Sequence, residues 1–204
     1  MKHKTLVVVG SGGHASVVVD AARLMNAWTS IVVLDQQMDG KALKVDALYA
    51  NRKDYLNQAE FIVAVGNNND RKRLLEELKS EGVSIATVIN PSAVIATSAI
   101  VGPGTCVLAG AILNPFVQVG QGVIINTKVS VDHHGVIGEY THVAPGATLA
   151  GEVTVGSLGF IGTGASISNQ IKITSNVIIG AGGVVIADIT KSGTYVGVPV
   201  KQIK

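Results

Sequence analysis

Residues 119–138 read VGQGVIINTKVSVDHHGVIG, and the pattern in them runs through half of the chain. An aliphatic residue returns at every sixth position, and four residues later comes a second one that is small or β-branched in nearly every repeat. The first column is Val119, Ile125, Val131, Ile137, Val143, Leu149, Val155, Ile161, Ile167, Ile173, Ile179 and Val185. Towards the N-terminus we interpret the pattern as resuming, after one extra residue, at Ile112, Cys106, Ile100, Val94 and Val88, which gives seventeen hexads with a single slip.

A fixed short period of this kind predicts a solenoid in which each repeat buries its apolar face only against its neighbours. The composition agrees, because 47% of the residues are hydrophobic and only 15% are charged. The chain also has 24 glycines, where average usage would give roughly 14. We expect glycines in the polar columns to supply the bends between strands. These are Gly138, Gly156, Gly162 and Gly180.

Charge is distributed unevenly, and this suggests where the domains divide. Only six of the 30 charged side chains lie within residues 88–190. The sequence therefore predicts an α/β domain over residues 1–87, a repeat domain over 88–190 and a C-terminal tail over 191–204.

The first 87 residues alternate between β-branched runs and helical segments. The predicted strands are Thr5–Val9, Ile31–Leu34, Phe61–Val65 and Val83–Val88. One helix is expected over about residues 15–25, and another runs from a cap at Asp70 to about Ser80. This alternation predicts a small parallel sheet, whose ligands lie at the carboxyl ends of its strands.

A glycine-rich loop, Gly10-Ser11-Gly12-Gly13-His14-Ala15, follows the first strand. It matches the dinucleotide fingerprint, in which glycines allow close backbone approach and a helix N-terminus attracts phosphate. Fewer than 90 residues cannot supply two full nucleotide-binding halves, so a mononucleotide or a nucleotide-sugar pyrophosphate fits better. Asp35, at the end of the second strand, is placed to receive a ribose hydroxyl. The alternative is a tight turn without a ligand and an Asp that only ends a strand.

Several classes of protein are disfavoured by charge and cysteine content. A net charge of +2 is too small for the basic field that nucleic-acid or membrane binding needs. The single cysteine, Cys106, cannot form an internal disulfide, and no leader or run of 18 apolar residues is present. We therefore expect a cytoplasmic protein that binds neither nucleic acid nor membrane.

Further motifs recur in a fixed order along nearly the whole chain. They are the Gly10–His14 loop, Val65-Gly66-Asn67-Asn68 followed by Arg71-Lys72, Asn90-Pro91-Ser92-Ala93, Asn126-Thr127, Asp132-His133 with Val136-Ile137-Gly138, His142-Val143, Pro145-Gly146-Ala147 and Val196-Gly197-Val198-Pro199. Together they resemble the hexapeptide-repeat sugar acetyltransferases of the NeuD/PglD family. This family comprises sialic acid O-acetyltransferases and bacillosamine-pathway UDP-4-amino-sugar N-acetyltransferases. The resemblance implies a Rossmann-like N-terminal α/β domain followed by a left-handed parallel β-helix of three hexads per coil.

Acetyl transfer needs a base for the nucleophile, a donor for the oxyanion and alignment of both substrates. The repeat half offers three histidines, His133, His134 and His142. Neutral imidazole suits proton transfer, and the resemblance places the family's base at His133, with His142 as the next candidate. In an 18-residue coil Gly151 lies directly above His133, and the resemblance suggests its N–H as the oxyanion donor.

The resemblance assigns the remaining site residues. His142, with Gly151, would hold the acetyl group, and Asn126 matches a substrate-side asparagine. Thr163 and Ala181 match positions that contact the pantetheine arm through their backbone, and Lys201 is a candidate partner of a coenzyme A phosphate. The nucleotide-sugar side is assigned to Gly12, Gly13, His14, Asp35, Gly66 and Asn67.

One position departs from the family pattern. An acidic residue often follows the base, but this chain has His134 there. A histidine base needs a partner to fix its tautomer, and an imidazole is a poorer partner than a carboxylate. Asp132 is a candidate, although strict β alternation would point it away from His133. His134 itself is left without a role.

The favoured function is acetyl-CoA-dependent N-acetylation of a nucleotide-linked 4-amino-dideoxy sugar, with direct attack on the thioester and without a metal. O-acetylation of a sialic-acid-type sugar is an alternative, as is a non-enzymatic nucleotide-sugar-binding solenoid. A zinc hydrolyase, with histidines of neighbouring subunits as ligands, is a further alternative. The resemblance also implies a homotrimer with coenzyme A between adjacent subunits.

Overall fold

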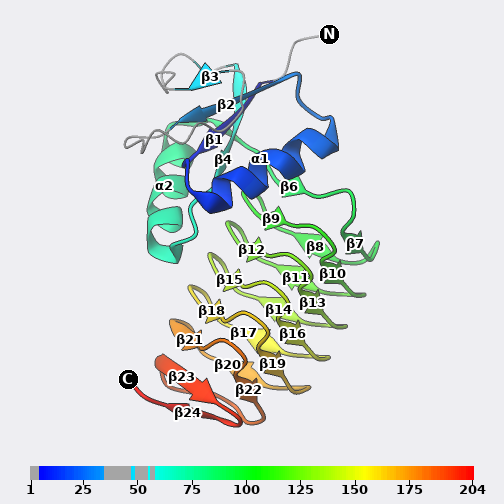
Figure 1. The fold of residues 1–204 in the computed structure, drawn as a ribbon, viewed down its shortest axis with the longest axis vertical. Helices are drawn as coiled ribbons and strands as arrows, with labels where there is room; N and C mark the ends of the chain where they lie inside the picture. The colour runs from blue at the N-terminus through cyan, green and yellow to red at the C-terminus, as the bar shows by residue number, and fades with distance from the viewer. Residues whose placement is uncertain (1–4, 35–46, 49–54, 56–57) are drawn as a thin grey trace.

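A computed structural model describes residues 5–34, 47–48, 55 and 58–204 of the chain. An N-terminal α/β unit sits at one end of a stack of coils, and a strand hairpin closes the other end (Figure 1). This arrangement confirms the expected fold class of a short α/β region followed by a parallel β-solenoid.

The N-terminal unit is built on a five-stranded parallel sheet in the order β3-β2-β1-β4-β5. Its strands are β1 (Thr5–Val9), β2 (Ser30–Leu34), β3 (Ala47–Leu48), β4 (Ala59–Val63) and β5 (Ser84–Ile85). The sheet order reverses between β1 and β4, so the loops that follow these two strands flank a switch point, where α/β sheets bind ligands.

Two helices of 13 residues each pack beside this sheet, α1 (Gly13–Met25) and α2 (Asn68–Ser80). The prediction that Asp70 caps α2 was wrong. Asn67 is the cap, because its side chain accepts the N–H groups of Asn69 and Asp70 at 2.9 and 3.1 Å. These are the second and third helical residues, which an N-cap side chain reaches, so Asp70 lies inside the first turn.

The solenoid consists of short strands that form three sheets, named here by their order in each coil. Sheet I contains β6 (Val88–Ile89), β9 (Cys106–Val107), β12 (Ile124–Ile125), β15 (His142–Val143), β18 (Phe160–Ile161), β21 (Val177–Ile179), β23 (Gly193–Gly197) and β24 (Val200–Gln202). Sheet II contains β7 (Val94–Ile95), β10 (Ile112–Leu113), β13 (Ser130–Val131), β16 (Thr148–Leu149), β19 (Ser166–Ile167) and β22 (Val184–Val185). Sheet III contains β8 (Ile100–Val101), β11 (Gln118–Val119), β14 (Val136–Ile137), β17 (Thr154–Val155) and β20 (Lys172–Ile173).

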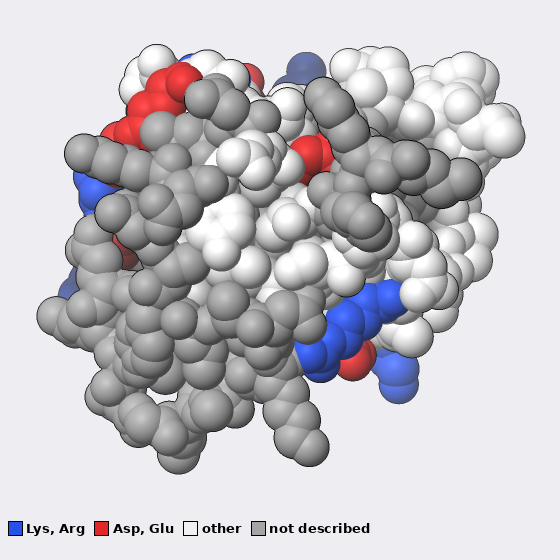
Figure 2. Space-filling view, turned by 90° about the horizontal axis from the view of Figure 1, so that it is seen from above, with Lys and Arg blue, Asp and Glu red and all other residues white. Residues whose placement is uncertain are grey.

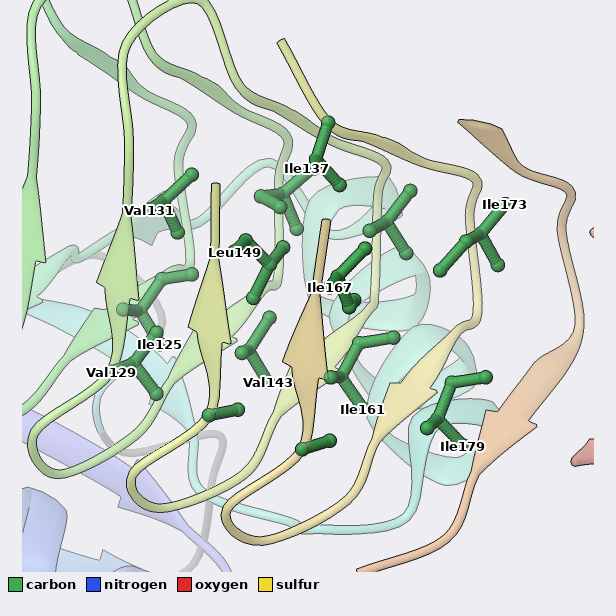
Figure 3. Packing of buried hydrophobic residues seen from close by; sticks show 14 of the residues in the cluster. Ile125, Val129, Val131, Ile137, Val143, Leu149, Ile161, Ile167, Ile173 and Ile179 are labelled. Carbon is green, nitrogen blue, oxygen red and sulfur yellow. The ribbon is translucent and has the colours of Figure 1, made fainter. Parts of the chain in front are cut away.

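Neighbouring strands within each sheet are parallel and 18 residues apart, except at the C-terminal hairpin, where β24 runs antiparallel to β23. The predicted column from Val119 to Val185 faces inward and is buried throughout (Figure 3). Like residues stack on like along the solenoid axis, so the core is a narrow apolar prism.

The predicted slip before Val119 is absent. Leu113 pairs with Val131 and with Ile95, so the inward column continues in steps of six through Leu113, Val107, Val101, Ile95 and Ile89. Both residues of these early strands are aliphatic or nearly so, which left the register ambiguous in the sequence. Burial separates them, because Leu113 is 1% exposed and Ile112 is 39% exposed. The second residue of each strand points inward and the first outward.

The outward residues of the first sheet I strands are covered by the N-terminal unit. Val88 and Cys106 share one buried cluster with Val18, Ala22 and other residues of α1. This explains why the predicted strand Val83–Val88 is divided. Its start pairs with β4 as β5, whereas Val88 begins β6 and belongs to the solenoid.

Charged side chains are sparse on the N-terminal face. Where described residues form that face, Lys and Arg lie in separate places near Asp or Glu and do not form one continuous field (Figure 2). In the described part of the chain, no helix has both the length and the apolar character to cross a membrane.

The corrected register can be tested with a pair of neighbouring substitutions. We expect Leu113→Ala to lower the free energy of unfolding by about 2–5 kcal/mol, because it leaves a cavity in the packed core. Ile112→Ala should lower it by less than about 1 kcal/mol, because that side chain is partly in solvent. Urea unfolding followed by circular dichroism measures both values. Equal effects, or a larger effect at Ile112, would restore the slipped register.

Candidate active site

The candidate site residues fall into two groups. The interface cluster lies where the N-terminal unit meets sheet I and consists of His14, Asn68, Arg71, Asn126 and His142. The corner cluster lies at the turn between sheets II and III and consists of Phe116, Asp132, His133, His134 and Gly151.

Arg71 of α2 holds the interface cluster together. Its side chain is 1% exposed and donates five hydrogen bonds. They go to the carbonyls of Val65 (2.9 Å), Gly66 (3.0 Å), Gly122 (2.7 Å) and Tyr140 (2.7 Å) and to Oδ1 of Asn68 (2.7 Å). Two of these carbonyls belong to solenoid corners and two to the loop after β4, so one guanidinium joins both units.

Asn68 adds a second connection between the units. Its amide donates to the carbonyls of Leu158 and Gly159 at 3.2 and 2.8 Å while its oxygen accepts from Arg71. Asn68 and Arg71 were seen in the sequence only as parts of a motif and were given no role. Their spacing of three residues placed them on one helix face, but nothing in the sequence indicated which backbone groups they would meet.

Burial of this cluster controls its protonation. Burial lowers the pKa of Arg71 to about 10, so it stays charged at neutral pH. Burial, with a further contribution from the positive charge of Arg71, lowers the pKa values of both His14 and His142 to about 4. Both imidazoles are therefore neutral at pH 7 and can accept or donate a hydrogen bond without charge.

His142 opens β15 and points out of the solenoid toward the N-terminal unit. Its Nε2 lies 3.0 Å from Nδ2 of Asn126, one coil earlier. Its ring packs edge-on against Phe160 (5.1 Å between centroids) and lies 6.2 Å from the ring of His14. Nε2 of His14 is buried without a hydrogen-bond partner among the described residues, which suits a polar atom of a bound molecule.

The loops at the switch point are open. Gly12 is the N-cap of α1, and a side-chain carbon added at Gly12, Gly13 or Gly66 would meet no atom within 4 Å. The first turn of α1 thus presents backbone N–H groups to an accessible space, as an anion site requires. The side chain of Asn67 is occupied in capping α2, and Asp35 lies outside the described residues.

At the corner cluster, Asp132 supports the backbone. Its Oδ1 accepts the backbone N–H of His133 at 2.8 Å and the side-chain amide of Asn114 at 2.9 Å. The imidazole of His133 instead has Nδ1 3.2 Å from Nδ1 of His134. The neighbour of the His133 ring is therefore the residue that the sequence left without a role.

Gly151 lies over His133, as the 18-residue coil predicts. A Cβ at this position would be 2.5 Å from Cε1 and 2.6 Å from Nε2 of His133, so only glycine lets the next coil pass over the imidazole. The carbonyl of Gly151 accepts from Gln170 at 2.8 Å, while its N–H has no backbone partner in the described chain. A base nitrogen and a free N–H thus lie side by side.

One chain does not bring all predicted site residues together. His133 and His142 belong to the same coil, but β14 and a further turn separate them, so they lie at different edges of the prism. Thr163 and Ala181 are exposed at the corner between sheets I and II, one above the other, and Lys201 is exposed on β24. The base and the residues assigned to the acetyl and pantetheine groups therefore face different sides.

Within the described ranges, no three His, Cys, Asp or Glu side chains are placed to hold a metal ion. The three solenoid histidines are divided between the two clusters. This geometry gives no support to a zinc site within a single chain.

Comparison with known proteins identifies relatives along the whole chain. The family model described as "PglD N-terminal domain" matches residues 5–78. The acetyltransferase domain of PglB from Neisseria gonorrhoeae is 34% identical, with a TM-score of 0.90 over 98% of this chain and 99% of that chain. A second structure of that domain is a complex with acetyl coenzyme A, with a TM-score of 0.92.

PerB from Caulobacter crescentus, in complex with CoA and GDP-perosamine, is 34% identical, with a TM-score of 0.87 over 98% of this chain and 97% of that one. The UDP-N-acetylbacillosamine N-acetyltransferase of Bacillus subtilis is 36% identical over 106 residues. That match spans 47% of this chain and 47% of the relative's length.

A solenoid of six-residue repeats, with a histidine under a glycine at one corner and a small α/β unit docked on one sheet, defines a hexapeptide-repeat acyltransferase. More narrowly, the chain belongs to the NeuD/PglD family of sugar acetyltransferases.

The lowered histidine pKa values predict a pH-dependent stability. Between about pH 6.5 and pH 4 the unfolded chain binds protons on His14 and His142 that the folded chain does not. The free energy of unfolding should therefore fall as pH falls through this window, by up to about 1.4 kcal/mol per pH unit for each histidine. NMR titration of the imidazoles checks the cause, and ordinary midpoints near 6.5 for both rings would contradict it.

Proposed function

We propose that the protein is an acetyl-CoA-dependent N-acetyltransferase that acts on the amino group of a nucleotide-linked amino sugar. The observation that carries this proposal is the placement of the His133 imidazole against Gly151, whose N–H has no backbone partner in the described chain. A proton acceptor beside an oxyanion donor is what direct acyl transfer from a thioester requires.

In the proposed reaction the sugar amine attacks the thioester carbonyl carbon while Nε2 of His133 removes a proton from the amine nitrogen. The carbonyl oxygen becomes an oxyanion and accepts the N–H of Gly151. When the intermediate collapses, the C–S bond breaks, and the imidazolium of His133 returns the proton to the coenzyme A sulfur. The products are an amide and free coenzyme A, and His133 is neutral again.

The N-terminal unit supplies the acceptor site in this proposal. Its switch point opens between the loops after β1 and β4, and the N-terminus of α1 offers N–H groups to a pyrophosphate. PerB was solved with GDP-perosamine and CoA, and the Bacillus subtilis relative is named for a UDP-linked sugar. These names support a nucleoside-diphosphate sugar as the substrate class, with the 4-amino-dideoxy type favoured by the original resemblance.

We further propose a homotrimer in the cytoplasm, with each site shared by two chains. The separation of His133 from His142 along one coil supports this, because a neighbouring chain can bring its interface cluster to the corner of another. The thioester would then lie between chains, with its carbonyl near His142 and Asn126 of one and its reacting carbon beside His133 of the other. The pantetheine arm would follow the exposed corner at Thr163 and Ala181, and Lys201 would approach a phosphate.

The reaction is tested by measuring thiol release from acetyl-CoA with UDP-, GDP- and dTDP-linked 4-amino sugars and free sialic acid. We expect activity with one nucleotide-linked amino sugar and at least a hundredfold loss in His133→Ala, because the base is removed. His142→Ala is the comparison variant, since His142 is the alternative base. Activity with sialic acid alone would indicate O-acetylation, and equal turnover by wild type and His133→Ala would exclude His133 as the base.

The shared site is tested by mixing two inactive variants. Co-assembled His133→Ala and His142→Ala chains should regain about a quarter of wild-type activity, because random assembly joins intact halves in about a quarter of the sites. A mixture of His133→Ala with Gly151→Ala should regain nothing, since both changes affect the same corner of one chain. Light scattering reports the assembly state, and a monomer of 21 kDa would contradict the trimer.

A further inference from the structure

We propose that His134 is the positioning residue for His133 and that the two imidazoles act as one proton-binding pair. This inference rests on the proposed function, since it concerns the residue assigned as the base. The observation behind it is the contact of 3.2 Å between Nδ1 of His133 and Nδ1 of His134.

The chemistry of the contact fixes the tautomers. For Nε2 of His133 to accept a proton, its Nδ1 must carry the hydrogen, and that N–H needs an acceptor. Nδ1 of His134 is that acceptor when His134 carries its own proton on Nε2. After His133 has taken the substrate proton, the same N–H donates from an imidazolium, and the hydrogen bond becomes stronger.

Packing holds His134 in place for this task. Its ring stacks on Phe116 of the preceding coil, with centroids 4.9 Å apart and an angle of 26° between the planes. Its backbone has a φ of 59°, and its N–H donates to the carbonyl of Pro115 at 3.0 Å. The rings of His133 and His134 stand nearly perpendicular, at 82°, so that one ring lies on the stack while the other meets Gly151.

The other charged groups around His134 leave this role to it. Asp132, in the same turn, directs Oδ1 to a backbone N–H and to Asn114. Glu152 occupies the equivalent corner one coil later, and its carboxylate accepts from Gln170 at 3.4 Å. The preceding coil contributes only the apolar Phe116 to this corner.

The chain itself supplies the substitutions for a test. The corner held by His134 recurs every 18 residues as Phe116, Glu152 and Gln170, with φ angles of 64°, 61° and 64°. Phenylalanine, glutamate and glutamine are thus all accepted at this backbone position. His134→Phe keeps an aromatic ring on Phe116 and removes the acceptor, whereas His134→Gln and His134→Glu restore one.

The kinetic test compares the pH dependence of kcat/KM in these variants. We expect His134→Phe to lose about tenfold in kcat/KM at pH 8, the value of one neutral hydrogen bond, and to move the acid limb to lower pH. His134→Gln should recover to within about threefold of wild type. His134→Glu, combined with Glu152→Gln to avoid two adjacent carboxylates, should move the acid limb to higher pH. Gln170→Phe, the same change of corner two coils on, should leave kcat/KM unaltered.

A spectroscopic test is independent of turnover. In wild type, the ¹⁵N shifts of His133 should report a proton on Nδ1 and a free Nε2, and in His134→Phe the proton should redistribute toward Nε2. An unchanged tautomer together with an unchanged pH profile in His134→Phe would overturn the proposal. If wild type acetylates no sugar, the proposed function fails, but the tautomer measurement still decides whether His134 orients His133.

Discussion

The structure depends on one buried cation that has no anion beside it. The guanidinium of Arg71 is held by four carbonyl oxygens and one amide oxygen, and these come from both the α/β unit and the solenoid. A charge in this position is tolerated only because every N–H is satisfied, so the hydrogen bonds fix the geometry closely. The same charge keeps His14 and His142 neutral, and it thereby links the docking of the two units to the protonation of the site.

Periodicity explains why so much of the fold could be predicted. Each hexad contributes one inward residue, and twelve uninterrupted repeats leave no other register for the column from Val119 to Val185. The early coils were misread at Ile112 and Leu113 because both residues are aliphatic. The α/β unit covers outward apolar residues there, so hydrophobicity alone does not distinguish the two faces. The cap at Asn67 was missed for a similar local reason, since Asn67 and Asp70 are both good capping residues.

The site was predictable in its composition and less so in its arrangement. Spacing along the solenoid correctly placed Gly151 over His133, because 18 residues return the chain to the same corner. The nine residues between His133 and His142 are half a coil and send the two side chains to different edges. Contacts that join distant segments left no periodic trace in the sequence. The donors of Arg71 and the pairing of Asn126 with His142 belong to this kind, as does the stack of Phe116 on His134.

Eight corners of the solenoid carry residues other than glycine in the left-handed backbone region, among them Lys128, Tyr140, Leu158 and Asn176. Each such residue costs about 1–2 kcal/mol relative to an ordinary conformation. The coils accept this cost with side chains of every chemical type, since the side chain at a corner projects away from the apolar prism. Residue identity at the corners is therefore largely uncoupled from the stability of the stack. Over evolutionary time a solenoid of this kind can exchange the groups at its reactive corner, and so explore new acceptors, without refolding its core.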